Sequence, residues 1–216
     1  MNHLETGISN QNKWYKPIAI FSAVFAMYLL GSAIGLVIYL VFNGDLSSLI
    51  SLDVPITIGL FIFVFMPFLG LFPISILLIK VFYKRSFQMV INGTQSVRWG
   101  RIFFGMLLWG NITIMQILMA YFMDPENFII SFQLEPFIYL ILISLIVFPI
   151  QSSFEEFFFR GYLAQIVAGW FKSRWLAIII PSILFGVIHA GNPEVGAYGW
   201  GVMMIQYIGI GIIFGL

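Results

Sequence analysis

Long uncharged apolar runs are the feature of this sequence that most restricts what the chain can fold into. Six apolar segments lie at residues 17–42, 54–79, 102–123, 136–154, 175–190 and 198–216. The first three contain no charged side chain, and each exceeds the about 20 residues that a helix needs to cross a bilayer core. Because a helix satisfies its own backbone hydrogen bonds in lipid, the segments predict an all-α, polytopic transmembrane bundle of about six spanning helices.

The composition excludes a soluble enzyme. Hydrophobic residues make up 61% of the chain and charged residues 9%, whereas globular proteins carry about 25% charged residues. Lipid must therefore be the solvent of most of the surface, and we expect membrane lipid as a partner. The net charge of +1 predicts no nucleic-acid partner, because binding phosphates needs a dense basic stripe. Without cysteine, catalysis must use carboxylate, histidine, hydroxyl or amide groups.

Charged residues are distributed unevenly between the apolar segments. The second connection carries the basic residues Lys80, Lys84, Arg85, Arg98 and Arg101. The first and third connections carry the acidic residues Asp45, Asp53, Asp124, Glu126 and Glu135. Basic loops stay on the cytoplasmic side of a membrane, so this pattern predicts a cytoplasmic second connection and a cytoplasmic N-terminus.

Two adjacent carboxylates and an arginine interrupt the apolar pattern at QSSFEEFFFR, residues 151–160. Burying these charges costs several kcal/mol each without partners. On a helix, Glu156 and Arg160 are four residues apart and share a face, so they can pair, while Glu155 points about 100° away. Glu155 is therefore the candidate general base and acid.

An alternative interpretation places these charges at the headgroups, where they would only flank a helix end. The sequence continues as an apolar, helix-compatible stretch over residues 161–170, which argues against that alternative. A helix over residues 136–170 would be about 52 Å long, so it must tilt, kink near Pro149 or project beyond a core of about 30 Å.

A lone histidine ends the apolar motif FGVIH at residues 185–189. Taken alone, such a histidine is more often a hydrogen-bonded packing residue. If the chain reverses near Ser173, however, Glu155 lies 18 residues before the turn and His189 lies 16 residues after it. At about 1.5 Å per residue, both lie roughly 24 to 27 Å from the turn. We therefore expect the two groups to meet in one polar cavity suited to a proton relay, a metal site or water activation.

These two motifs carry a family resemblance. The sequence Glu155-Glu156-Phe-Phe-Phe-Arg160 resembles the EExxxR motif, and Phe185-Gly-Val-Ile-His189 the FxxxH motif, of the CAAX prenyl protease and bacteriocin-processing membrane proteins, also called the Abi family. The resemblance covers residues 136–216, which would form the catalytic core. Residues 1–135 would form a polar tail and three further transmembrane helices.

The resemblance implies an intramembrane endopeptidase in which Glu155 activates a water for attack on a peptide carbonyl. Glu156 and Arg160 would hold the helix and orient the site, Phe185 would contact substrate, and His189 would position water or bind a metal. Members are commonly labelled metalloproteases, and zinc is a candidate cofactor that the resemblance does not establish. A zinc site takes three protein ligands plus water, of which Glu155 and His189 supply at most two, so the motifs leave open a mechanism by a glutamate with histidine and no metal.

The resemblance also implies a substrate class and a location. The substrate would be a peptide or a prenylated or lipidated protein, and the role would be bacteriocin maturation or immunity in a bacterial plasma membrane. The charge pattern places the Ser173 turn inside, and hence the candidate site toward the outer half of the bilayer, whereas prenylated substrates are cytosolic. Three explanations of this conflict stay open: the hairpin has the opposite orientation in the membrane, the long helix enters the membrane obliquely, or the substrate is a different peptide.

The sequence departs from the family pattern at its C-terminus. Members continue into a further helix that carries a second histidine and, four residues later, an asparagine or aspartate. This sequence ends within the glycine-rich segment 209–216. We therefore expect a C-terminally incomplete catalytic core that lacks the second catalytic histidine, for which His3 in the polar tail is a poor substitute.

Two other functions stay open from the sequence. A proton-coupled transporter would use Glu155, Glu156, Arg160 and His189 as a relay, although the sequence lacks the repeats of many carriers. A non-catalytic immunity or scaffold protein would use the same charges only to hold its helices together.

Overall fold

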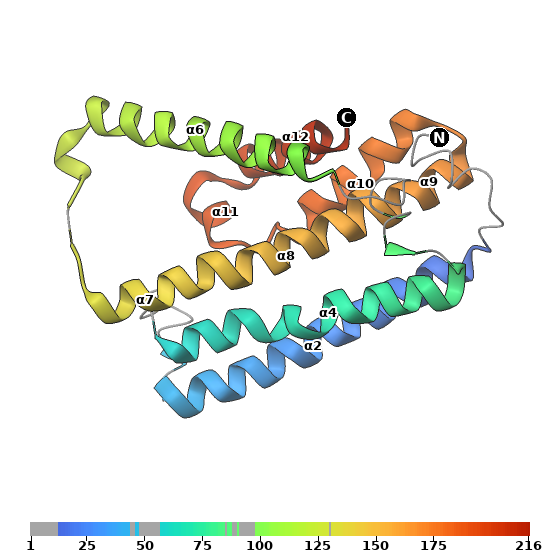
Figure 1. Ribbon diagram of the computed structural model, residues 1–216, viewed down its shortest axis with the longest axis horizontal. Coiled ribbons are helices and arrows are strands. Elements are labelled where there is room, and N and C mark those ends of the chain that lie inside the picture. Colours follow the sequence, from blue (N-terminus) through green and yellow to red (C-terminus); the bar gives the residue numbers. More distant parts are fainter. Residues whose placement is uncertain are drawn as a thin grey trace.

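The structure, a computed structural model, describes residues 13–43, 46–47, 57–84, 86–87, 90, 98–129 and 131–216. The predicted all-α class is confirmed, because the regular elements of these residues are helices (Figure 1). In chain order they are α2 (Tyr15–Asn43), α4 (Ile58–Tyr83), α6 (Trp99–Met123), η1 (Pro125–Asn127), α7 (Leu134–Leu142), η2 (Ile143–Val147), α8 (Phe148–Glu155), η3 (Glu156–Leu163), α9 (Ala164–Phe171), α10 (Arg174–Ile188), α11 (Pro193–Tyr198) and α12 (Trp200–Gly215). His3, Asp45, Asp53 and Arg85 lie outside the described residues.

Four helical stretches are long and apolar enough to cross a membrane: Tyr15–Phe42, Ile58–Tyr83, Trp99–Met123 and Leu134–Phe171. The other two predicted segments form shorter apolar helices, α10 with 15 residues and α12 with 16 among the described residues. The chain is an integral membrane protein, and its described residues hold four helices long and apolar enough to cross a membrane together with these two shorter ones, in agreement with the predicted polytopic bundle.

The fourth stretch is one helix of 38 residues, Leu134–Phe171, and it carries the candidate acidic motif. It contains two π-helical segments, η2 and η3, and such wider turns occur frequently at functional sites. Pro149 lies inside this continuous helix, directly after the π-helical segment η2, in a position where a proline removes one backbone hydrogen bond of the helix. The stretch exceeds the thickness of a hydrocarbon core, as the sequence predicts, and it accommodates Pro149 next to a π-helical turn.

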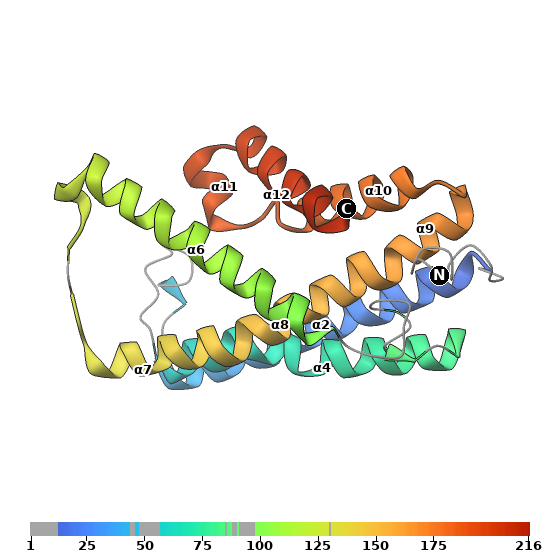
Figure 2. The same ribbon diagram turned by 45° about the horizontal axis from the view of Figure 1, so that its top comes forward.

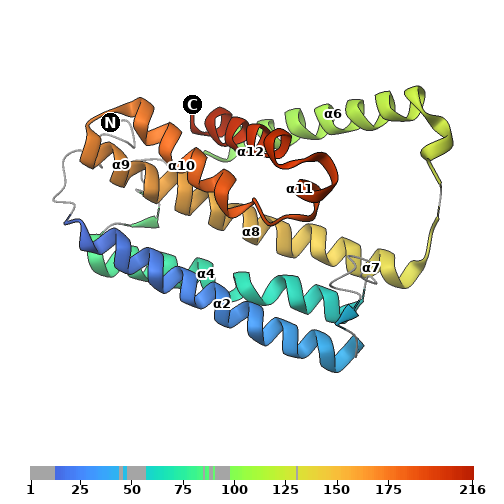
Figure 3. The same cartoon turned by 180° about the vertical axis from the view of Figure 1, so that it is seen from behind.

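The long helix lies between two groups of helices. Figures 1 and 3 show α2 and α4 side by side along one flank of it, and α10, α11 and α12 along the other. Figure 2 shows that α10–α12 form a group apart from the α2–α4 pair. Helix α9 ends at Phe171 and α10 begins at Arg174, with the Ser173 side chain capping α10. The predicted reversal near Ser173 is thus present, and it brings α10 back along η3.

Glycines let the helices of each group approach closely. A Cβ atom at Gly31 would lie 2.7 Å from the Pro67 Cα atom of α4, and one at Gly211 would lie 2.9 Å from the Ser182 Cβ atom of α10. Small residues at helix contacts allow such close approach in membranes. Helix α6 differs, because it buries none of its residues.

Aromatic side chains from the long helix fill the space between the two groups. Phe157, Phe158 and Phe159 are each no more than 3% exposed and pack with residues of α2, α4 and α10. Consecutive buried phenylalanines anchor η3 on several sides at once. This packing holds the adjacent carboxylates at a defined rotation of the helix.

Candidate active site

Glu155 and Glu156 stand where the α-helix changes into a π-helix. Glu155 is the last residue of α8 and Glu156 the first residue of η3. The Gln151 side-chain amide donates a hydrogen bond of 3.0 Å to Glu155 Oε1 from one turn earlier. The neutral Gln151 amide therefore orients the Glu155 carboxylate. Glu155 is only half-buried, so part of its side chain stays accessible.

The predicted pair between Glu156 and Arg160 is confirmed. Arg160 Nη1 lies 3.2 Å from Glu156 Oε1, and the Arg160 side chain is 11% exposed while that of Glu156 is 47% exposed. The Arg160 guanidinium carbon also lies 4.2 Å from the centroid of the Phe185 ring of α10. A cation over an aromatic face is attracted by the ring quadrupole, so Arg160 joins η3 to α10.

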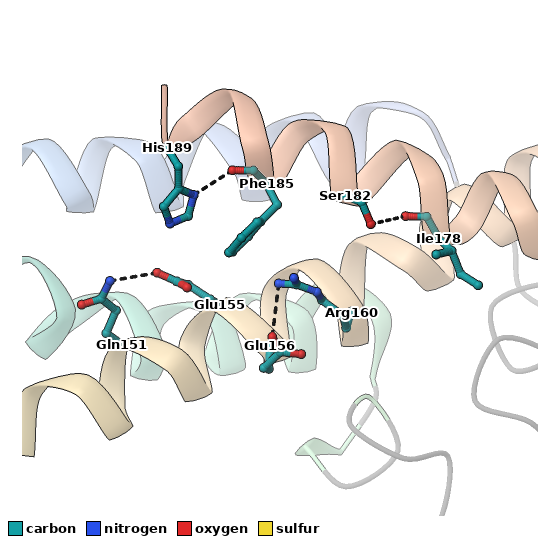
Figure 4. A network of polar contacts seen from close by, with 8 residues as sticks. All are labelled: Gln151, Glu155, Glu156, Arg160, Ile178, Ser182, Phe185 and His189. Atoms are coloured by element: carbon teal, nitrogen blue, oxygen red, sulfur yellow. Dashed lines mark hydrogen bonds and ion pairs between the residues drawn. The ribbon is translucent and has the colours of Figure 1, made fainter. Parts of the chain in front are cut away.

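His189 caps the C-terminus of α10. Its Nδ1 atom lies 2.7 Å from the backbone carbonyl oxygen of Phe185. Because a carbonyl oxygen only accepts hydrogen bonds, Nδ1 carries a proton in this geometry, and the neutral tautomer that fits it has its lone pair on Nε2. Figure 4 shows the Glu155 and His189 side chains facing each other from neighbouring helices.

The structure brings Glu155 and His189 together at one cavity of about 380 Å³. Gln151 and Asn192 supply further polar groups to its wall, and apolar side chains of α2 and α4 supply much of the remainder. The prediction from the sequence that Glu155 and His189 meet at one cavity is therefore confirmed. The catalytic roles of the two residues stay predictions.

Glu156 and Arg160 line a different cavity of about 590 Å³. Phe159 contributes to the walls of both cavities, whereas the two adjacent carboxylates line one cavity each. Arg160 Nη1 and Nη2 are buried and make no hydrogen bond among the described residues, so the contact of Nη1 with Glu156 is an ion pair without hydrogen-bond geometry. This ion pair lines a different cavity from the one that Glu155 shares with His189.

Phe185 connects the two motifs. Its ring lies 4.3 Å from the His189 ring and 5.6 Å from the Phe159 ring, measured between centroids. The side chain is 8% exposed, and Phe185 is absent from the described walls of both cavities. Its predicted contact with substrate stays a prediction, whereas its contacts with His189 and Arg160 position both side chains.

Four polar residues near the site had no role predicted from the sequence: Gln151, Asn192, Glu194 and Tyr207. Gln151 binds Glu155, as described above. Beyond His189, Asn192 donates hydrogen bonds to the Tyr207 hydroxyl at 3.1 Å and to Glu194 Oε1 at 3.3 Å, and the Tyr207 hydroxyl donates to Glu194. This donated bond lowers the pKa of the Glu194 carboxyl below its ordinary value. The positions of Asn192 and Glu194 just after FxxxH were a local signal, while Tyr207 had none.

The fold and the site define a polytopic membrane protein that holds a carboxylate and an imidazole at a shared cavity beside its long helix. Residues 134–216 match the family described as type II CAAX prenyl endopeptidase Rce1-like. This part of the chain is similar to that family, and the resemblance predicted from the two motifs is confirmed.

A curated relative adds a comparison over more of the chain. The uncharacterized protein YyaK of Bacillus subtilis (strain 168) is 34% identical over 141 residues, which cover 64% of this chain and 46% of the relative. The chain spans about half the length of that relative. No solved structure matches the chain.

Proposed function

We propose that this chain carries the water-activating site of a CAAX-type intramembrane endopeptidase. The observation that carries the proposal is the cavity shared by Glu155 and His189, within a region that matches a family of prenyl endopeptidases. Two rare ionisable groups at one depth of a membrane protein are expensive to bury and mark functional sites.

Glu155 is the proposed base. Its carboxylate takes a proton from a water in the cavity, and the hydroxide formed attacks the carbonyl carbon of the substrate peptide bond. The protonated Glu155 then gives its proton to the leaving amine, so one group acts as base and acid in turn. The bond from Gln151 restrains the carboxylate while the proton moves.

His189 is the proposed partner of Glu155. The Phe185 carbonyl holds Nδ1–H, which leaves the Nε2 lone pair to accept a hydrogen bond from the same water. Glu156 and Arg160 are proposed to orient the site indirectly, because their ion pair and the stacking of Arg160 on Phe185 lock η3 against α10.

The family resemblance offers zinc as a candidate cofactor without establishing it. Within the part of the chain that the structure describes, no group of three or more His, Cys, Asp or Glu side chains is placed to hold a metal ion. A zinc site takes three protein ligands plus water, so these residues do not fit one by themselves. We therefore assign no step of the reaction to a metal, and metal analysis of the purified full-length protein would test zinc directly.

Mutation of the two facing residues tests the proposal. Glu155→Gln and His189→Ala in the full-length protein should each reduce cleavage of a peptide reporter by about 10² to 10⁴-fold, since that is the range for general acid–base catalysis. Glu126→Gln, in the exposed turn η1, is the matched control and should cleave like the unmodified protein. Unchanged cleavage by both site variants at equal expression would refute the proposal.

The substrate and biological role are proposed on the family resemblance. We propose a peptide or a prenylated or lipidated protein as substrate, in bacteriocin maturation or immunity at a bacterial plasma membrane with a cytoplasmic N-terminus. A strain carrying Glu155→Gln should then lose the bacteriocin phenotype of the parent strain. An unchanged phenotype would instead favour the non-catalytic scaffold function.

A further inference from the structure

A polar cluster at the end of α10 holds the two helices that follow His189. Tyr207 of α12 donates a hydrogen bond through its hydroxyl to Glu194 of α11, and Asn192 donates to both of them. All three side chains come from residues outside the EExxxR and FxxxH motifs. Asn192 also lines the cavity of Glu155 and His189, so the cluster borders the candidate active site.

The Tyr207 ring also contacts the His189 imidazole. Their centroids are 4.9 Å apart at an interplanar angle of 35°, and the Phe185 ring lies 4.3 Å from the same imidazole. His189 is therefore in contact with two aromatic rings, one from its own helix and one from α12. Loss of the Tyr207 ring would free the imidazole to rotate and to release the bond from Nδ1 to the Phe185 carbonyl.

We propose that Tyr207 is a positioning residue that holds the His189 imidazole in one orientation and one tautomer. Its ring supplies the packing surface, and its hydroxyl supplies the anchor to Asn192 and Glu194. The anchor adds to the packing of Gly211 and Gly215 against α10, because Gln206 and Tyr207 are the two side chains with amide or hydroxyl groups on an otherwise apolar, glycine-rich α12. The effect on catalysis rests on the proposed function, whereas the effect on His189 does not.

Histidine NMR tests this inference directly, because the chain contains two histidines and His3 serves as an internal reference. In ¹⁵N-histidine-labelled protein, His189 should show a single tautomer protonated at Nδ1. Tyr207→Leu, which removes ring and hydroxyl, should give mixed tautomers at His189 with His3 unchanged. Tyr207→Phe keeps the ring but loses the anchor, and should give an intermediate spectrum. Tyr198→Phe, at a residue that is 70% exposed, should match the unmodified protein.

Peptide cleavage provides the second measurement. With His189 misplaced, kcat should fall by roughly tenfold in Tyr207→Phe and up to about 100-fold in Tyr207→Leu, with KM nearly unchanged. An unaltered His189 spectrum in folded Tyr207→Leu, or in Tyr207→Phe if the leucine variant does not fold, would overturn the inference. Altered His189 signals in a protein that cleaves no peptide would support the positioning role and refute the proposed function instead.

Discussion

Replacement of Gly211 by alanine tests the close contact between α12 and α10. The added Cβ atom would lie 2.9 Å from the Ser182 Cβ atom and 3.0 Å from its Cα atom. Ordinary contact begins at 3.4 Å, so the helices must separate by about 0.5 Å. Because the Cα atom belongs to the backbone of α10, a change of side-chain rotamer does not relieve the clash. Overpacking of this kind costs about 1–3 kcal/mol.

Gly209→Ala is the matched control in the same helix. No described atom outside the local helix lies within 4 Å of its added Cβ atom, so alanine there should only gain the about 0.5–1 kcal/mol of helix preference over glycine. The same gain applies at Gly211, and it leaves a net loss of about 0–2.5 kcal/mol for Gly211→Ala. The two variants should therefore differ in unfolding free energy by the full overpacking cost of about 1–3 kcal/mol.

Unfolding in mixed micelles of increasing SDS content, followed by tryptophan fluorescence, measures this difference. Gly211→Ala should also cleave peptide more slowly, since Tyr207 lies one turn earlier on the displaced helix. Equal unfolding free energies for the two variants would show that α12 does not pack on α10 through Gly211, and the positioning of His189 by α12 would lose its basis.

Two further changes probe the polar contacts of the site. Gln151→Leu removes the donor to Glu155 Oε1. A hydrogen bond to a charged group contributes about 1.5–3 kcal/mol, so kcat should fall at least about tenfold. Ser152→Ala, which removes a hydroxyl that contacts the Pro149 carbonyl oxygen at 3.4 Å, is the control, and equal rates for the two variants would contradict the role of Gln151. The bond from Tyr207 lowers the pKa of Glu194 below 4.5, so its contribution to stability is complete above that pH and is lost as the pH falls through the folded-state pKa. The stability difference between the unmodified protein and Tyr207→Phe should therefore be constant above about pH 4.5 and narrow as the pH falls below that value, and a difference that stays constant on acidification would contradict this linkage.

Counting residues along the helices predicted two features of the site, one ion pair within a helix and one pair of residues at the same depth on neighbouring helices. The pair between Glu156 and Arg160 follows from a separation of four residues, which persists into the π-helical segment at 3.2 Å. The prediction that Glu155 and His189 lie at the same distance from the Ser173 turn follows from counting the residues between each of them and that turn. Both predictions needed only the rise and repeat of a helix, so they did not depend on how the other helices pack.

Helix positions were predicted closely, because each apolar segment of the sequence forms helix. The segment 175–190 corresponds to α10, which begins at the Ser173 cap and ends at His189. The segment 198–216 contains α12, which packs on α10 through Gly211. Apolar composition records affinity for lipid, whereas the Ser173 cap defines the residue at which α10 begins.

The sequence by itself determined that the chain enters the membrane, that its described part is helical, and which carboxylate pairs with Arg160, because these follow from hydropathy and from the geometry of a single helix. Only the tertiary structure decided that Glu155 and Glu156 face different cavities, that Arg160 stacks on Phe185, and that Tyr207 contacts His189. Such contacts between helices depend on how each helix is rotated about its axis. That rotation is set by close packing at glycines and buried aromatic rings, which no local pattern records.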